Sequence, residues 1–189
     1  GVLFVEDMSS KLRFYDLDGT ALATVARDSS VTDAGTDTEF FRLTGSDGSE
    51  TVGEVYGGYI RVRRAGTTAE FETGIGRFKN DVRIGPSGPV DVIETVWKYS
   101  FASMGSTGRR AFTIPSIAYN QASGELLTLM SDAVAQTSSV DMKIVRFTQD
   151  GSRISEVWDL PDDGTLNPYV DMTVGPDGRI FVLDDVADV

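Results

Sequence analysis

Polar and apolar residues alternate in short runs along most of this chain. Residues 11–15, 59–63 and 143–147 are three such runs. A strand with one buried face has this period of two, whereas an amphipathic helix repeats its apolar residues at three and four positions. Clusters of Gly, Asp, Ser and Pro separate the runs, as turns separate strands. The pattern predicts an all-β protein.

Two families of turns alternate along the sequence. The first has the pattern Gly-x-Asp/Ser-Gly and occurs at residues 45–48, 85–88 and 175–178, with a looser version at 120–124. The second ends in Gly19, Gly66, Gly108 and Gly151. Glycine suits turn positions with positive φ, and proline suits the corner before them. Members of the second family lie 47, 42 and 43 residues apart. A period of this length with two hairpin turns gives four strands in each repeat.

A repeating unit of four short strands is typical of β-propeller blades. β-Sandwiches also have frequent turns, but they do not require such a unit. We therefore expect residues 1–189 to form a single β-propeller segment of four-stranded antiparallel blades. The expected divisions are a partial blade at 1–27, blades at about 36–77, 78–114 and 115–161, and a partial blade at 167–189.

Two internal matches support a repeat. Residues 81–88 align with residues 171–178 without a gap, and residues 178–184 correspond to residues 1–7. In a closed four-bladed ring, the second match would make one strand redundant. We therefore expect an incomplete segment of a larger propeller.

Two segments carry a motif of a known kind of repeat. Residues 167–184 contain Asn-Pro-x-Val and then Gly-Pro-Asp-Gly-Arg-Ile-Phe-Val-x-Asp, and residues 11–19 contain a strand followed by Asp-Leu-Asp-Gly. In these motifs the chain resembles NHL-type repeats and the bacterial six-bladed β-propeller proteins. The resemblance implies about six blades and points to a bacterial extracytoplasmic protein.

Composition restricts the possible functions. The net charge of −12, from 29 acidic and 17 basic residues, argues against nucleic-acid binding, which requires a basic surface. No apolar run approaches the roughly 20 residues of a membrane-spanning helix, so we expect no membrane insertion. The chain contains no Cys and no His. These absences argue against disulfides, thiolate or histidine metal sites and Ser-His-Asp catalysis.

Four acidic residues, Asp7, Glu94, Asp132 and Asp184, recur near the ends of the expected second strands of the blades. In a propeller they would surround the mouth of the central channel, where carboxylates could bind Ca²⁺ or a cationic ligand. Alternatively, each carboxylate accepts hydrogen bonds from backbone N–H groups and so stabilises the conformation of its loop. These four are the candidate ligand-binding residues, and no catalytic residue is expected.

Other polar segments are weaker candidates. Arg61, Arg63 and Arg64 form a small basic cluster, but alternation places Arg61 and Arg63 on one strand face, the expected solvent face. That placement argues against a phosphate site. The expected loops at 131–141 and 28–38 are the predicted contact surfaces, because variable loops commonly carry binding residues.

The leading interpretation is a non-catalytic binding module without a cofactor, whose partner is a protein, a peptide or a glycan. The alternative implied by the resemblance is a calcium-dependent lactonase or related hydrolase, with Asn80, Asn120 and Asn167 near the expected first strands. A third interpretation is a structural module of a larger surface protein. The sequence leaves the oligomeric state open.

Overall fold

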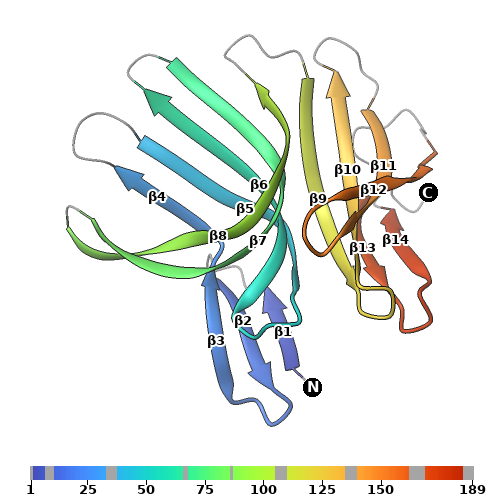
Figure 1. Ribbon diagram of the computed structural model, residues 1–189, viewed down its shortest axis with the longest axis horizontal. Coiled ribbons are helices and arrows are strands. Elements are labelled where there is room, and N and C mark those ends of the chain that lie inside the picture. Colours follow the sequence, from blue (N-terminus) through green and yellow to red (C-terminus); the bar gives the residue numbers. More distant parts are fainter. Residues whose placement is uncertain are drawn as a thin grey trace.

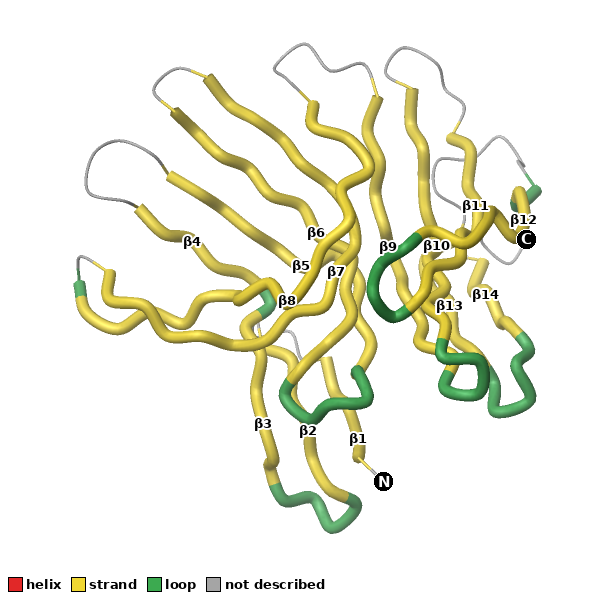
Figure 2. Tube along the Cα trace, in the orientation of Figure 1, coloured by secondary structure: helices red, strands yellow, loops and turns green. Residues whose placement is uncertain are grey.

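The computed structural model describes residues 2–6, 11–32, 38–65, 68–85, 87–104, 110–134, 140–161 and 169–184. Within these ranges the chain forms fourteen strands, and no residue is helical (Figure 2). All strand pairs there are antiparallel. The predicted all-β class is confirmed. The same ranges contain no helix that is long and apolar enough to cross a membrane.

Sheet I consists of β1 (Val2–Glu6), β2 (Lys11–Asp16) and β3 (Ala21–Ala26). The alternation in β2 buries Leu12 and Phe14 on one face. The turn from β2 to β3 closes at Gly19, whose φ of 89° suits glycine and whose N–H donates to the Asp16 carbonyl. The predicted turn at this position is confirmed.

Sheet II consists of β4 (Asp28–Thr32), β5 (Thr38–Gly48), β6 (Glu54–Ala65), β7 (Thr68–Gly85) and β8 (Gly88–Met104), paired in chain order. Strands β7 and β8 are the longest of the described part, with 18 and 17 residues. Their pairing shifts register near Thr73 and near Arg77, and such bulges bend a strand and increase its twist. The sheet curls into a half-barrel with an open concave face (Figure 1).

Sheets III and IV complete the described part. Sheet III is a four-stranded meander of β9 (Arg110–Asn120), β10 (Glu125–Val134), β11 (Val140–Thr148) and β12 (Arg153–Asp159). Sheet IV pairs β13 (Tyr169–Val174) with β14 (Ile180–Asp184). Positive φ at Gly124, Gly151 and Gly178 closes three of their turns, as the turn pattern predicts.

The four sheets stack face to face in chain order, with a buried cluster at each junction. Sheets I and II share a cluster that includes Leu12, Phe14, Phe41, Tyr59 and Phe78. Sheets II and III share Tyr56, Ile75, Ile114, Leu126 and Phe147, among others. Sheets III and IV share Leu127, Leu129, Ile144 and Met172, among others. Strand β9 lies against β5 and β6 on one side and against β13 on the other. The core is therefore divided into layers between successive sheets.

Some predicted turns and loops differ from the structure. Residues 45–48 lie inside β5, and the turn falls instead at residues 49–53, where Gly53 has a φ of 87°. Residues 28–32 of the expected loop form β4, and residues 131–134 extend β10. Residues 33–37, 66–67, 105–109 and 135–139 lie outside the described part. Gly and Ser near residue 45 suit a turn, but Gly45 lies within a strand, where the absence of a side chain allows close packing against Pro115.

The sheets also divide the chain differently from the expected blades. Strands β4 to β8 form one five-stranded sheet, and β9 runs unbroken through residue 114. The turn at residues 85–88 joins the last two strands of sheet II, whereas that at residues 175–178 joins β13 to β14. The aligned segments therefore occupy different positions in their sheets. Their sequences match because both form tight turns, which need the same residue types wherever they occur.

Close packing joins the β5–β6 hairpin to β9. A Cβ atom on Gly45 would lie 2.5 Å from the Pro115 carbonyl oxygen, and one on Gly58 would lie 2.7 Å from Ile114 Cβ. The Thr44 hydroxyl donates to the Ile114 carbonyl at 2.8 Å. Neither glycine can therefore carry a side chain without moving one sheet away from the other.

We expect Gly45→Ala to lower the free energy of unfolding by about 1–3 kcal/mol, because the added methyl group overlaps backbone that cannot rotate away. Urea unfolding followed by fluorescence measures this loss. Gly48→Ala is the matched control, since its Cβ would lie 3.4 Å from Phe4 Cβ, an ordinary contact. Equal losses in the two variants would contradict the packing role of Gly45.

Candidate functional site

A charged pocket of about 380 Å³ occupies the concave face of sheet II. We call it the sheet II pocket. Its lining comprises Ser29, Glu39, Phe41, Arg61, Arg63, Arg83, Val92, Ile93, Glu94, Thr95 and Lys98. The residues come from all five strands of the sheet, so the curl of the half-barrel is what brings them together.

Strand register explains why Arg61 and Arg63 reach this pocket. In the β5–β6 pair, Phe41 lies opposite Arg61 and Glu39 lies opposite Arg63. Directly opposite residues share a face, so all four side chains lie on the concave side. The two arginines share a face, as predicted, and Arg63 is exposed on it, whereas Arg61 is half-buried. The curl of the sheet, which alternation does not encode, turns this face into a pocket wall.

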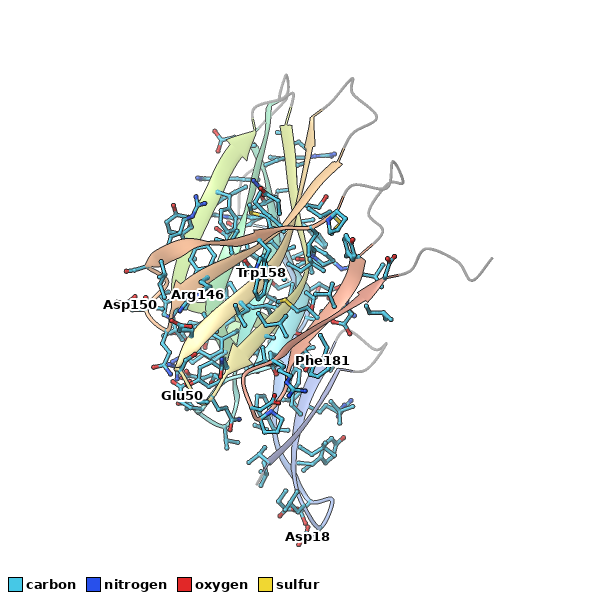
Figure 3. The ribbon with its side chains drawn as sticks, turned by 90° about the vertical axis from the view of Figure 1, so that its right-hand side faces the viewer. Asp18, Glu50, Arg146, Asp150, Trp158 and Phe181 are labelled. Carbon is cyan, nitrogen blue, oxygen red and sulfur yellow. The ribbon has the colours of Figure 1, made fainter. Side chains whose placement is uncertain are left out.

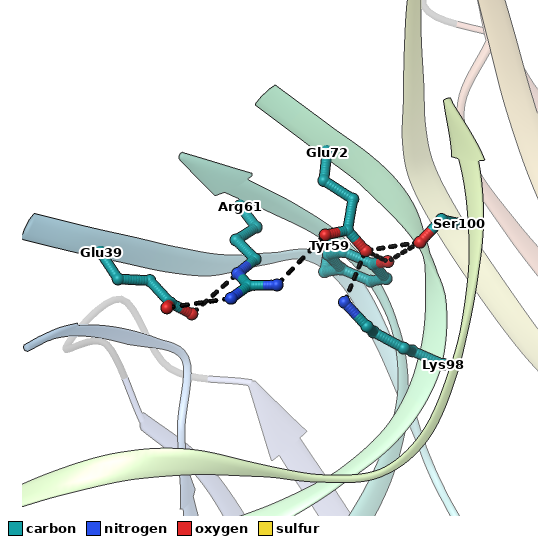
Figure 4. Close-up of polar contacts among 6 residues, drawn as sticks. All are labelled: Glu39, Tyr59, Arg61, Glu72, Lys98 and Ser100. Carbon is teal, nitrogen blue, oxygen red and sulfur yellow. Dashed lines mark hydrogen bonds and ion pairs between the residues drawn. The ribbon is translucent and has the colours of Figure 1, made fainter. Parts of the chain in front are cut away.

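Arg61 is held in a fixed orientation by two carboxylates (Figure 4). Its guanidinium donates to both oxygens of Glu39, at 2.8 and 3.0 Å, and to Glu72 at 3.3 Å. Bidentate pairing of this kind fixes both distance and plane. The hydrogen bond to Glu39 raises the pKa of Arg61, so the guanidinium stays charged at every accessible pH.

Glu72 is the centre of the network behind the pocket (Figure 4). Its carboxylate accepts hydrogen bonds from Lys98 Nζ at 2.6 Å, the Ser100 hydroxyl at 2.5 Å and the Tyr59 hydroxyl at 2.6 Å. Partial burial by itself would raise the pKa of Glu72. The hydrogen bonds from Lys98, Ser100 and Tyr59 outweigh that effect and lower the pKa to about 2. Glu72 is therefore ionised at neutral pH.

Aromatic packing connects the network to the core. Tyr59 is only 1% exposed, and its ring stacks on Phe41 with centroids 5.1 Å apart. Burial, together with donation to Glu72, raises the pKa of the Tyr59 hydroxyl above its ordinary value. Tyr59 therefore remains a neutral hydrogen-bond donor. Because Phe41 also lines the pocket, the floor of the site is supported by the cluster between sheets I and II.

The opposite wall comes from the β7–β8 hairpin. Arg83 is 60% exposed, and its Nε lies 3.8 Å from Asp81, a loose ion pair. Glu94 pairs with Lys79 across the two strands at 3.3 Å. Other cavities lie near Tyr119 and Asp47 at the turn end of sheets II and III. We take the sheet II pocket as the candidate site because fixed charges gather in it.

The structure places the four predicted acids as follows. Asp7 lies outside the described residues. Glu94 is on β8 and lines the sheet II pocket, Asp132 is on β10 opposite Asp141, and Asp184 ends β14. These three belong to three different sheets. In the described ranges, no group of three or more carboxylates is placed to hold a metal ion.

Sequence reasoning missed Glu39, Glu72, Arg83 and Lys98. Each lies on a strand of sheet II, and they come together only through register and curvature. One signal for Glu72 was present in the sequence. Glu70 and Glu72 are spaced like Arg61 and Arg63 and carry the opposite charge, which is typical of two strands that pair. Comparison with protein-family models, with curated proteins and with solved structures found no match to this chain.

We expect Glu72→Gln to reduce stability at pH 7 by about 2 kcal/mol, because the carboxylate is replaced in a network of donors and cations. The pKa of Glu72 is lowered from 4.5 to about 2 in the folded protein. Its contribution is therefore complete above about pH 4.5 and is lost as the pH falls towards 2. Denaturant unfolding of both proteins at several pH values measures the difference.

Glu70→Gln is the control, since Glu70 is an exposed carboxylate on the same strand. We expect it to change stability by less than about 0.5 kcal/mol at every pH. A stability difference between Glu72→Gln and the unmodified protein that stayed constant down to pH 2 would show that the carboxylate charge is not what stabilises the network.

Proposed function

We propose that this protein is a non-catalytic binding module that holds a small anionic ligand in the sheet II pocket. The observation that carries the proposal is the local charge. In a chain of net charge −12, the residues that line the pocket include four cationic and only two acidic ones. A surplus of positive charge in a concave, partly desolvated site attracts an anion.

The acids at the site already have cationic partners. Glu39 is paired with Arg61, Glu94 with Lys79, and Glu72 behind the pocket with both Arg61 and Lys98. Arg61 and Lys98 are therefore oriented in advance, so little side-chain entropy is lost when a ligand binds. Among the described residues, Arg83 pairs with Asp81 alone, loosely at 3.8 Å. A ligand carboxylate or phosphate could take the place of Asp81.

Size and lining narrow the class of ligand. A volume of about 380 Å³ is at the lower end of the range for small-molecule sites. The lining also includes the apolar residues Phe41, Val92 and Ile93 and the hydroxyl-bearing residues Ser29 and Thr95. This combination suits a carboxylate- or phosphate-bearing molecule with a compact polar body, such as an acidic sugar.

We propose further that the four sheets are propeller-type blades. Support comes from sheet III, a four-stranded meander whose inner strand β9 lies between the inner strands β5 and β13 of its neighbours. Sheet II departs from this pattern through its fifth strand β4 and its curl. On this proposal the curl is a modification of one blade that creates the binding pocket. The resemblance to NHL-type repeats belongs to the same proposal.

We expect binding to be measurable by calorimetric titration with glucuronate, glucose 6-phosphate and inorganic phosphate, with glucose as the neutral comparison. Arg83→Ala and Arg63→Ala should each weaken binding about tenfold, because each removes a charged donor. Arg179→Ala is the matched control, since Arg179 is an exposed arginine on the β13–β14 turn. No binding of any anion, or equal losses in all three variants, would overturn the proposal.

The melting temperature with and without calcium distinguishes this function from that of a calcium-dependent hydrolase. A ligand that binds only the folded state raises the melting temperature in a saturable way. We expect no such rise when millimolar calcium is added to the purified chain. A saturable rise that Asp184→Asn abolishes would instead identify the predicted acids as a cation site.

A further inference from the structure

Two apolar sheet faces at opposite ends of the stack are exposed. On sheet IV, Phe181 and Leu183 are 55% and 59% exposed. Figure 3 labels Phe181 on this sheet. On sheet I, Leu3 is 54% exposed and Val5 is 36% exposed. We call the face of a sheet towards the next sheet in chain order its forward face, and the other its backward face.

A repeated strand shows which face is which. Strands β6, β10 and β14 each follow a glycine with positive φ, namely Gly53, Gly124 and Gly178. The second residue after the glycine points backward in the first two of these strands: Val55 packs on sheet I and Leu126 on sheet II. The third residue points forward: Tyr56 packs on sheet III and Leu127 on sheet IV.

Strand β14 follows the same rule. Ile180, the second residue after Gly178, packs backward on the cluster between sheets III and IV. Phe181, the third, therefore points forward, and Leu183 shares its face because side chains alternate. In β6 and β10 the equivalent position is buried by the next sheet, whereas Phe181 is half exposed.

Strand β1 shows the opposite half of the pattern. Residues 1–7 correspond to residues 178–184 in the repeat, so Leu3 corresponds to Ile180 and Phe4 to Phe181. Phe4 packs forward on the cluster between sheets I and II, as the rule requires. Leu3 and Val5 therefore point backward. The residues equivalent to Leu3 in the later sheets, Val55, Leu126 and Ile180, are each covered by the preceding sheet.

We propose that these two faces bind each other between copies of the chain, with the forward face of sheet IV on the backward face of sheet I of a second copy. The occupant follows from the repeat: the described residues form this kind of junction three times, and each outer sheet exposes one half of a further junction. Because the two faces differ, the contact is head-to-tail, and successive copies form a ring or an open array. The contact is separate from the sheet II pocket.

The test is sedimentation velocity of the whole chain over the micromolar range. The unmodified protein should grow in mass with concentration. Phe181→Asp and Leu3→Asp should each weaken association at least tenfold, because each places a charge at the centre of one face. Leu183→Asp serves as a second variant of the sheet IV face, and circular dichroism checks that each variant folds.

Mixing gives the sharpest outcome. The Phe181→Asp chain keeps its sheet I face, and the Leu3→Asp chain keeps its sheet IV face, so a mixture should form a one-to-one dimer that grows no further. Ile84→Asp is the control, since Ile84 is 83% exposed near the tip of the β7–β8 hairpin, and it should not change association. An unmodified chain that stays monomeric throughout, or variants that do not pair when mixed, would overturn the proposal.

Discussion

The close approach of β9 to the β5–β6 hairpin is the constraint on which the rest of the structure depends. Gly45 and Gly58 allow backbone to lie against Pro115 and Ile114 without an intervening side chain. Because side chains alternate, the face of β6 with Tyr56 and Gly58 must then pack on sheet III. The other face, with Tyr59 and Arg61, is left for sheet I and for the pocket. The contact of β9 with the β5–β6 hairpin therefore determines the position of both the core and the candidate site.

The polar network in the concave face contributes order more than stability. Its ion pairs are partly exposed, and pairs of that kind contribute little free energy individually. Glu72 differs because it collects three close donors, and its lowered pKa shows that the ionised form is strongly favoured. Arg61 and Lys98 are thereby held in place before any ligand arrives. Such pre-organisation is what a binding site requires from its supporting residues.

The stacked sheets resemble a repeat in one dimension, where each layer is stabilised by its neighbours. The glutamate after the turn glycine pairs with an arginine on the following strand in two sheets, as Glu54 with Arg77 and Glu125 with Arg146. The structural repeat therefore includes equivalent charged residues as well as equivalent hydrophobic residues. A layered stack also ends in faces built like its interior, which is why apolar side chains remain at both ends.

The sequence by itself determined the features that depend on local physics. Alternation identified the strands, such as the one at residues 11–16, and the need for positive φ identified turns at Gly19, Gly88, Gly124, Gly151 and Gly178. Tertiary structure alone decided which strands share a sheet, why Gly45 is small, and that Arg61 faces a pocket containing Glu39, with Glu72 behind it. These outcomes depend on register and sheet curvature, which arise from contacts between residues distant in the chain and leave no periodic trace in it.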